Sequence, residues 1–434
     1  MKKSGFKINL EITFIIALTV FSFITSLINI NFPAHKIFDE VYRITRAEMF
    51  FSGQSYFSPQ PRFGKALLIL GMLVFGDNPL GWRIIQVITE SLLVPVGYLV
   101  AKKIFKYKYS GLLTAFFITF ELIYLAYSRV GVTTMNLAFF RVLSLLLFIL
   151  STENKDLKSK VFYFLCAIIT GLTIAIKWTA LSLLPIFWLW GKTKNNLKNT
   201  LHKNLSFKIL FLVIIVLTYT LTFMGEKGNF QYDHLKYNMP DSNFIEGLIS
   251  WHKLAFNTHL HAHNHHPCSS KWYTWPLMYK PMLMYWSFDT ISKKITCILG
   301  FGNPIIWWSG ILAILFQLFL LFFKRDRIMI FLLGSYFISF LPYTFITRPM
   351  FLYHYLSSLF ILILILEYTF VNLYKEKKYL RPVLMLLIGL IVAAFFYFYP
   401  FVNGYPISIE EYKHRLWFES WREYSLSIKK ILNN

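Results

Sequence analysis

The chain has 434 residues, of which 56% are hydrophobic, 19% aromatic and only 15% charged, and its formal net charge is +23. This apolar fraction excludes an ordinary soluble domain, because the surface of such a domain must be covered by polar groups. In a soluble protein the positive charge would suggest nucleic acid, but here many of the basic residues lie in short connections between apolar runs, where they set membrane topology. We therefore expect no nucleic-acid partner.

Continuous apolar runs recur along the chain and predict an all-α polytopic membrane protein rather than a β-barrel, whose strands would alternate. The first run is too long for a signal peptide and lacks a small-residue cleavage site, so we interpret it as an anchor. Eleven transmembrane helices are expected near residues 8–30, 82–101, 110–127, 132–150, 161–176, 178–190, 209–224, 301–323, 328–345, 353–372 and 382–400.

The basic residues are distributed unevenly between the two sides of these helices. Every second connection is rich in lysine and arginine, whereas the short connections on the other side carry the single charges Arg129, Lys177 and Arg348. Because positive charge marks the cytoplasmic side, the N-terminus is expected in the cytoplasm and the C-terminus outside.

Three long segments would then face outward, and we expect them to pack as one cap over a single domain that spans residues 1–434. They are residues 31–81, 225–300 and 401–434. Within the first segment, residues 39–52 and 63–76 are amphipathic or too short to span a bilayer, which predicts that they lie along the membrane surface.

The first outer segment opens with "FDEVYR", which places Asp39 and Glu40 at the outer end of the first helix. Adjacent residues on a helix point about 100° apart, so these two carboxylates cannot face each other as an acid–base pair. One of them could perform chemistry while the other orients a partner. The alternative is that Asp39 is an ordinary helix N-cap.

Charged residues inside the membrane are costly, so each needs a reason. Glu121 and Arg141 are expected at similar depth, which predicts that they form an ion pair, whereas Glu90 has no obvious partner. Arg129 and Arg348 lie at outer helix ends, where a lipid-linked phosphate could be bound by a guanidinium group. Arginines that merely reach the membrane interface would have the same positions.

The segment 251–286 is rich in histidine and aromatic residues. His261, His263 and His265 could line one face of a strand and bind a metal, although no cysteine or carboxylate joins them at a ligand spacing. A surface for a polar substrate is an equally good interpretation, since tryptophan and tyrosine suit both sugars and membrane interfaces. Cys268 and Cys297 share this outer region, and we expect them to be free thiols.

Several segments together resemble protein O-mannosyltransferases, which belong to the glycosyltransferase C-fold superfamily. The motif "FDEVYR" followed by "SYFSPQPRFGKALLILGMLVFG" resembles the first outer loop of that family, and "SRVGVTTMNLAFF", "GLTIAIKWTAL", "HPCSSKWYTWPLMYKP", "FGNPIIWW" and "RPMFLYHYL" follow in the family's order. The chain departs from the family pattern at Gln60, Arg62, Thr134, Cys268 and Tyr273. Because residues 225–300 are too few to contain the sugar-binding repeat domain of eukaryotic members, the resemblance is to a prokaryotic form.

The resemblance implies transfer of mannose from a polyprenyl or dolichyl phosphate carrier to serine or threonine hydroxyls of secreted or membrane proteins, at the outer face of the prokaryotic inner membrane. Asp39 would be the catalytic base and Glu40 would orient the acceptor. One base, with cations stabilising the departing phosphate, implies a single displacement with inversion. The further site residues implied are Arg129, Arg348, Lys177 and Lys271 for the donor phosphate and His266, Trp272 and Trp275 for sugar or acceptor.

No cofactor is expected beyond the lipid-linked sugar, and a divalent metal is possible but unsupported. One alternative keeps the fold and changes the acceptor to lipid A or another envelope glycolipid. A transporter would need a polar path and preferably inverted repeats, and the sequence has neither. A metal-dependent enzyme built on the histidines is a third alternative, which a chelator would test.

Overall fold

The computed structural model describes residues 9–54, 57–153, 156–193, 204–224, 229–232, 235–238, 244–260 and 266–422. Most of these residues are helical, and eight helical segments are long and apolar enough to cross a membrane. They contain α1 (Leu10–Leu27), α4 (Pro79–Ile104), α7 (Thr134–Ser151), α8 (Leu157–Ile174), α12 (Pro304–Leu321), α13 (Arg327–Phe340), α14 (Leu356–Glu376) and α15 (Arg381–Asn403). The predicted class of polytopic helical membrane protein is confirmed.

The other three predicted spans are also helical, but their helices are shorter. Residues 110–127 divide into α5 (Leu112–Thr119) and α6 (Leu122–Ser128). Residues 178–190 form a 3₁₀ turn, η1 (Trp178–Ser182), which continues into α9 (Leu183–Thr193), and residues 209–224 mostly form α10 (Leu205–Leu221). The number of eleven crossings therefore stays a prediction.

Glu121 is buried at the break between α5 and α6, where nearby donors compensate for the burial of its carboxylate. Its carboxylate accepts hydrogen bonds from the backbone N–H of Ile123 (3.3 Å) and of Asn303 (2.9 Å), and from the Trp307 indole (3.0 Å). These donors come from the start of α6 and from the start of α12, so Glu121 holds the broken helix against α12. The predicted ion pair with Arg141 is wrong, because these neutral donors bind the carboxylate and Arg141 bonds elsewhere.

Glu90, for which the sequence offered no partner, joins α4 to α1. Its carboxylate accepts hydrogen bonds from the hydroxyls of Ser22 (2.7 Å) and Ser26 (3.0 Å). Serines one turn apart on α1 thus compensate for the burial of this carboxylate.

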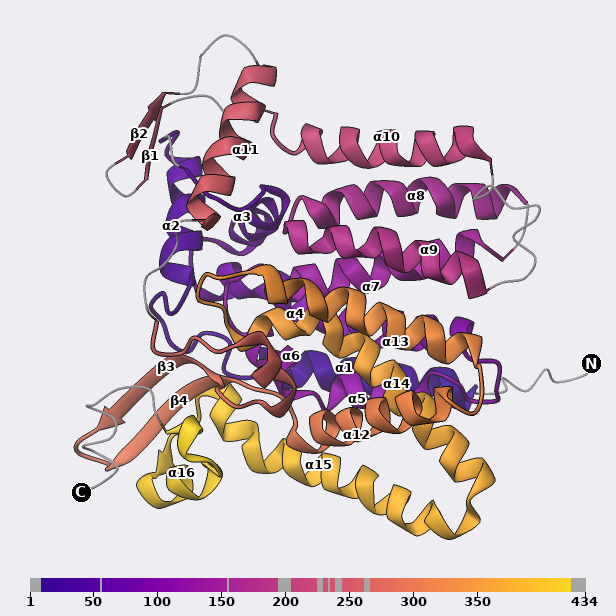
Figure 1. Ribbon diagram of the computed structural model, residues 1–434. Coiled ribbons are helices and arrows are strands. Elements are labelled where there is room, and N and C mark those ends of the chain that lie inside the picture. The colour runs from indigo at the N-terminus through magenta and orange to yellow at the C-terminus, as the bar shows by residue number, and fades with distance from the viewer. Residues whose placement is uncertain are drawn as a thin grey trace, which may run out of the picture.

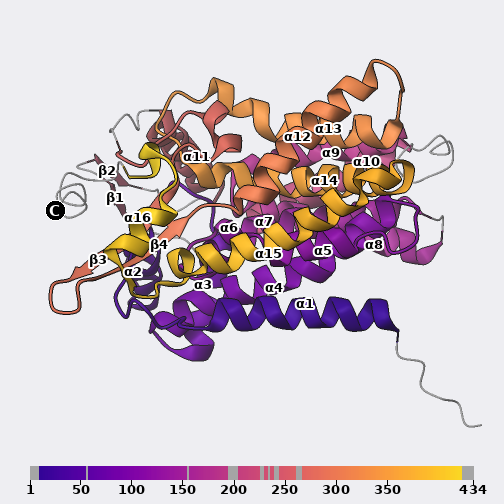
Figure 2. The same cartoon turned by 90° about the horizontal axis from the view of Figure 1, so that it is seen from below.

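The long outer segments gather at one end of the helix bundle (Figure 1). There α2 (Glu40–Phe51), α3 (Phe63–Phe75) and α11 (Phe244–Leu260) lie across the bundle axis. The position of residues 39–52 and 63–76 along the membrane surface stays a prediction. The hairpin of β3 (Met282–Asp289) and β4 (Lys294–Gly300) and the short α16 (Ile409–Arg415) lie at the same end. Figure 2 shows the same grouping from below, with α1 beginning at the opposite end. We call these outer elements the cap.

The cap contains strands that were not predicted. The hairpin of β3 and β4 pairs antiparallel with β5 (Ile407–Ser408), and a separate hairpin joins β1 (Asn229–Tyr232) to β2 (Leu235–Asn238). Only every second residue needs to be apolar in a half-buried strand, and the aromatic composition of this region obscured that pattern. His261, His263 and His265, predicted to share a strand face, lie outside the described residues.

The cysteines of the described chain are buried free thiols. Cys166 lies in α8, whereas Cys268 and Cys297 belong to the cap, and none of the three forms a disulfide. The prediction that Cys268 and Cys297 are free is confirmed.

Candidate active site

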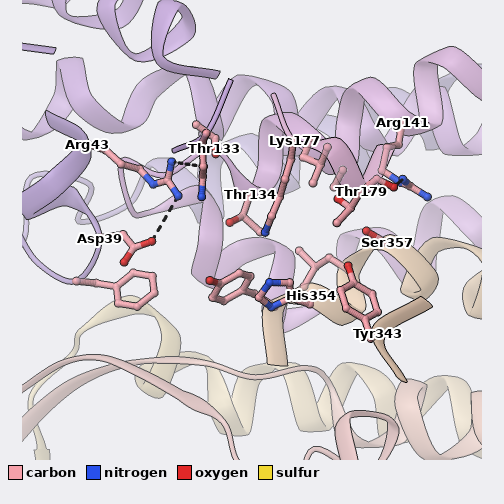
Figure 3. A pocket seen from close by; sticks show the side chains of 16 residues that line it. Asp39, Arg43, Thr133, Thr134, Arg141, Lys177, Thr179, Tyr343, His354 and Ser357 are labelled. Carbon is pink, nitrogen blue, oxygen red and sulfur yellow. Dashed lines mark hydrogen bonds and ion pairs between the residues drawn. The ribbon is translucent and has the colours of Figure 1, made fainter. Parts of the chain in front are cut away.

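A pocket with about 510 Å³ of empty space, part of it open to solvent, lies where the cap meets the helix bundle (Figure 3). Its walls come from α2, the segment that precedes α3, α7, η1 and the region between α13 and α14. The polar residues that line it are Asp39, Arg43, Gln60, Thr133, Thr134, Arg141, Lys177, Thr179, Tyr343, Tyr353, His354 and Ser357. Segments far apart in the sequence thus meet in one polar site.

Asp39 stands immediately before α2 and faces this pocket. Its side chain makes no capping hydrogen bond, so the alternative interpretation as an ordinary N-cap does not hold. One carboxylate oxygen lies 3.5 Å from the Arg43 guanidinium, which also donates to the Gln60 side-chain oxygen at 2.7 Å. Its side chain is 34% exposed, and this is the one polar contact that its carboxylate makes within the described part of the chain, so Asp39 keeps oxygen lone pairs available to a substrate.

Glu40 is fully buried and does not line the pocket. Its carboxylate forms a bidentate ion pair with Arg83 (2.8 and 3.0 Å) and also accepts from the backbone N–H of Ile37 (3.0 Å) and of Gly131 (2.6 Å). The Glu40 side chain therefore does not reach the pocket, and its predicted role of orienting the acceptor stays a prediction. Glu40 instead attaches the start of α2 to α4, which determines where the neighbouring Asp39 lies.

Arg129, the first candidate for the donor phosphate, also lies away from the pocket. Its guanidinium is fully buried and donates to the backbone carbonyls of Ile28 and Asn29, which follow the last turn of α1. Burial lowers the pKa of Arg129 to about 9. The last carbonyls of a helix have no hydrogen-bond partner within it. Arg129 supplies donors to the carbonyls at the end of α1, so its role in this structure is to stabilise the fold.

Lys177 lines the pocket as expected, between α8 and η1. Its ammonium lies 5.1 Å from the centre of the Tyr353 ring, and no carboxylate of the described residues forms an ion pair with it. Burial, followed by repulsion from Arg348, lowers the pKa of Lys177 to about 7. Arg348 does not line the pocket, but its positive charge lies close enough to lower the pKa of Lys177.

Arg141 is a pocket residue that was expected elsewhere. It is 6% exposed and donates to the backbone carbonyl of Thr179 (3.0 Å) and to the Ser339 hydroxyl (3.3 Å). Within the described ranges it has no carboxylate partner. A buried cation without a counter-ion is costly, so this position favours an anionic ligand.

An apolar groove with about 380 Å³ of empty space continues from the pocket between α7, α9 and α14. Pocket and groove share Ala138, Arg141, Leu356 and Ser357. Beyond these shared residues the groove is lined by Val142, Leu145, Leu183, Ile186, Phe360 and Ile361. The polar site therefore adjoins an apolar path among the helices of the bundle, and Arg141 lines both.

The remaining candidates for phosphate, sugar or acceptor contacts do not line the pocket. Lys271 is exposed before the 3₁₀ turn η4 (Trp272–Leu277), and Trp272 packs against Phe340 with ring centres 5.1 Å apart. His266 packs edge-on against Phe351 at 5.0 Å. The family resemblance implied a site position for all three residues. His266 and Trp272 instead pack against aromatic rings, and the Lys271 side chain is exposed.

Trp275 is 1% exposed and lies behind the pocket wall. Its ring stacks on His354 at 5.7 Å and packs edge-on against Tyr343 at 5.0 Å, and both of these neighbours line the pocket. Trp275 therefore supports the site without reaching a ligand.

In the part of the chain that the structure describes, no group of three histidine, cysteine, aspartate or glutamate side chains comes together to hold a metal ion.

Two family models match the chain. One describes the C-terminal four-transmembrane region of protein O-mannosyltransferase and matches residues 244–421. The other describes dolichyl-phosphate-mannose–protein mannosyltransferase and matches residues 59–219.

Among curated proteins, the chain is 25% identical over 425 residues to the polyprenol-phosphate-mannose–protein mannosyltransferase of Corynebacterium glutamicum, with 83% of this chain and 81% of that protein aligned. It is 22% identical over 422 residues to the protein of the same name from Mycolicibacterium smegmatis, with the same coverage.

Among solved structures, the chain is similar to the S. cerevisiae protein O-mannosyltransferase Pmt1–Pmt2 complex bound to the sugar donor. The TM-score is 0.80 at 13% identity, over 97% of this chain and 94% of that chain. ArnT from Cupriavidus metallidurans bound to undecaprenyl phosphate gives a TM-score of 0.54 at 15% identity, over 83% of this chain and 60% of that chain. At these identities the structural likeness establishes the fold.

Proposed function

The chain belongs to the protein O-mannosyltransferase family, and we propose that it transfers mannose from a polyprenyl phosphate carrier to a serine or threonine hydroxyl of a protein. The observation that carries this proposal is a carboxylate, Asp39, that shares a pocket with Lys177 and Arg141 beside an apolar groove. Neither cation has a carboxylate partner among the described residues. An envelope glycolipid as acceptor is not favoured, because both family models and the curated relatives are protein mannosyltransferases.

The donor would lie with its polyprenyl chain in the groove and its phosphate at the junction with the pocket. Apolar side chains of α7, α9 and α14 suit a hydrocarbon chain. Arg141 and Lys177 could then pair with the phosphate, and Arg348 would add positive charge nearby. In this arrangement Arg141 replaces Arg129 as the main guanidinium for the phosphate.

The transfer is a single displacement at the anomeric carbon. Asp39 accepts the proton of the acceptor hydroxyl while the hydroxyl oxygen bonds to the sugar, and the bond between the anomeric carbon and the phosphate oxygen breaks. The polyprenyl phosphate leaves with the bonding electrons, and the cations stabilise its growing charge. Figure 3 supports this direction of attack, since Asp39 and Arg141 lie at opposite ends of the pocket with Lys177 between them. Attack from the side opposite the phosphate inverts the anomeric carbon.

The protein is an integral membrane protein, and we propose that it lies in a prokaryotic inner membrane with its N-terminus in the cytoplasm and its pocket at the outer face. Two observations support this orientation. Basic residues are concentrated in alternate connections, and the cap with the pocket lies at the end of the bundle opposite the start of α1.

The direct test is to incubate membranes containing the chain with radiolabelled mannosyl-phosphoryl polyprenol. Label should enter protein and remain there after lipid extraction. Label found only in a glycolipid would instead support the alternative acceptor, and label in neither fraction would refute the proposed donor.

The base is tested by Asp39→Asn, which keeps the shape and removes the proton acceptor. We expect transfer to fall about 10²–10⁴-fold, the usual contribution of a general base. Glu48→Gln is the matched control, because Glu48 lies on the same helix and pairs with Lys36 away from the pocket. Normal transfer by Asp39→Asn would exclude Asp39 as the base.

A further inference from the structure

His354 lines the pocket with a hydrogen-bonding atom that no group of the described residues uses. It belongs to the 3₁₀ turn η6 (Leu352–Tyr355) and is only 3% exposed. Its Nε2 atom is buried and has no hydrogen-bond partner among the described residues. A buried polar atom left without a partner is uncommon in folded proteins and requires an explanation.

The other ring nitrogen determines what Nε2 can do. Nδ1 lies 3.0 Å from the backbone carbonyl oxygen of Phe351 and 3.4 Å from the backbone nitrogen of the same residue. Only an N–H group makes a favourable contact with a carbonyl oxygen at the shorter distance, so Nδ1 carries the proton and the longer contact is secondary. In the neutral ring Nε2 is then a hydrogen-bond acceptor with an unused lone pair.

Aromatic neighbours restrain the imidazole ring. It stacks against Trp275 at 5.7 Å and against Tyr353 at 4.4 Å, with interplanar angles of 14° and 21°. Tyr343 packs against it edge-on at 5.5 Å. The acceptor atom is therefore held in a constant orientation in the pocket wall before any ligand binds.

The chemistry of the proposed reactants shows which group can bind there. A sugar-linked phosphodiester has no hydrogen to donate, and the acceptor hydroxyl gives its proton to Asp39. The acceptor protein also has backbone N–H donors, but between the base and the phosphate the hydroxyls of the transferred sugar are the donors that we expect nearest to Nε2. In Figure 3 His354 lies between Asp39 and Arg141 and beside Lys177, which is the space that the sugar must occupy between base and phosphate.

We propose that His354 Nε2 accepts a hydrogen bond from one hydroxyl of the transferred sugar and so determines sugar specificity. This inference rests on the proposed function and adds a sugar-recognising residue to it. Trp275 then has an indirect role, because it fixes the ring of the residue that contacts the sugar.

The test compares mannosyl-phosphoryl polyprenol with each of its monodeoxy analogues as donors for the purified full-length chain. The wild type should use one analogue about 10–100-fold less well in kcat/KM than the others, because that analogue leaves Nε2 unpaired. Similar kcat/KM values for all analogues would overturn the proposal and indicate that Nε2 binds only water.

Two variants then connect that hydroxyl to His354. In His354→Phe the ring stack is kept and the acceptor is lost, so kcat/KM for the parent donor should fall about 10–100-fold while the value for the disfavoured analogue changes little. In His354→Gln the amide oxygen can replace Nε2, and the preference for the parent donor should return in part.

An equal fall in kcat/KM for every donor in His354→Phe would show a purely structural role and refute the proposal. If this variant fails to fold, as judged by size-exclusion chromatography, the comparison of the wild type with His354→Gln still decides the question. Absence of any transfer from the parent donor by the wild type would instead refute the proposed function itself.

Discussion

The adjacent carboxylates Asp39 and Glu40 have separate environments although they are neighbours in the sequence. Asp39 faces the pocket beside a partly exposed Arg43, whereas Glu40 is enclosed by Arg83 and two backbone N–H groups. Because a helix directs successive side chains about 100° apart, one residue of such a pair can reach a ligand while the other reaches the core. This division gives the two residues different expected mutational effects.

Replacing Glu40 with glutamine should destabilise the fold before it affects chemistry. The substitution leaves Arg83 buried without a counter-charge, which typically costs about 3–5 kcal/mol. Glu48→Gln on the same helix removes a partly exposed pair with Lys36 and should cost at most about 1 kcal/mol. Thermal unfolding of the two purified variants measures the difference, and equal stability would contradict the structural role of Glu40.

Lys177 predicts how donor use depends on pH. Its pKa is lowered to about 7 from an ordinary value of 10.5, so the ammonium that would bind the phosphate is lost as the pH rises through 7. We therefore expect kcat/KM for the lipid donor to fall on the alkaline side of about pH 7, since this ratio reports the free enzyme.

The control for this prediction is Lys177→Arg, whose guanidinium stays charged and should remove the alkaline fall. An unchanged pH profile in Lys177→Arg would exclude Lys177 as its cause.

The lowered pKa of Lys177 affects the stability of the fold in the opposite direction. Between pH 7 and 10.5 the unfolded chain binds more protons at Lys177 than the folded chain does, so this residue's contribution to stability rises with pH.

At the level of elements, α7, α9 and α14 together form a path that none of them has alone. Each contributes apolar side chains to the groove, and α7 also contributes Arg141 at its junction with the pocket. Filling the groove should therefore affect the lipid part of the donor more than its sugar.

Val142→Phe tests the groove. The larger side chain should raise KM for a long-chain donor about 10-fold or more, because overpacking a filled site has a cost of this order. The KM for a donor with a very short prenyl chain should change less. Val161→Phe is the matched control, because Val161 is 47% exposed on the outer surface of α8. Equal KM changes for long and short donors would place the lipid chain elsewhere.

At the scale of the whole molecule, the bundle has two different ends. The cap and the pocket lie at one end, and α1 begins at the other (Figures 1 and 2). The donor's phosphate and the acceptor protein must reach the same end for the proposed reaction to occur, so the orientation in the membrane is part of the mechanism.

Cysteine labelling in intact cells tests that orientation. Ile291→Cys, at a position 93% exposed in the turn between β3 and β4, should react with a membrane-impermeant maleimide. Leu157→Cys, at a position 75% exposed at the start of α8, should react only after permeabilisation. The described native cysteines are buried, so their own reaction with the maleimide should add little background labelling. The reverse pattern would place the pocket in the cytoplasm.

The sequence by itself was sufficient for the class of polytopic helical membrane protein, for the family resemblance, and for Asp39 and Lys177, which line the pocket. Apolar runs report burial along a continuous stretch, and α2 and α3 were expected because their runs are short and amphipathic. These are local properties, so a reading along the chain captures them.

Only the tertiary structure decided which polar residues meet. It placed Glu40 against Arg83, which lies 43 positions away, and Arg129 at the end of α1, about 100 positions away. It also brought Arg141 and His354 into one pocket, although no spacing in the sequence relates them. The physical reason is that a buried polar side chain must be paired by whatever group the fold brings near it, and that group is set by the packing of helices rather than by neighbours in the chain.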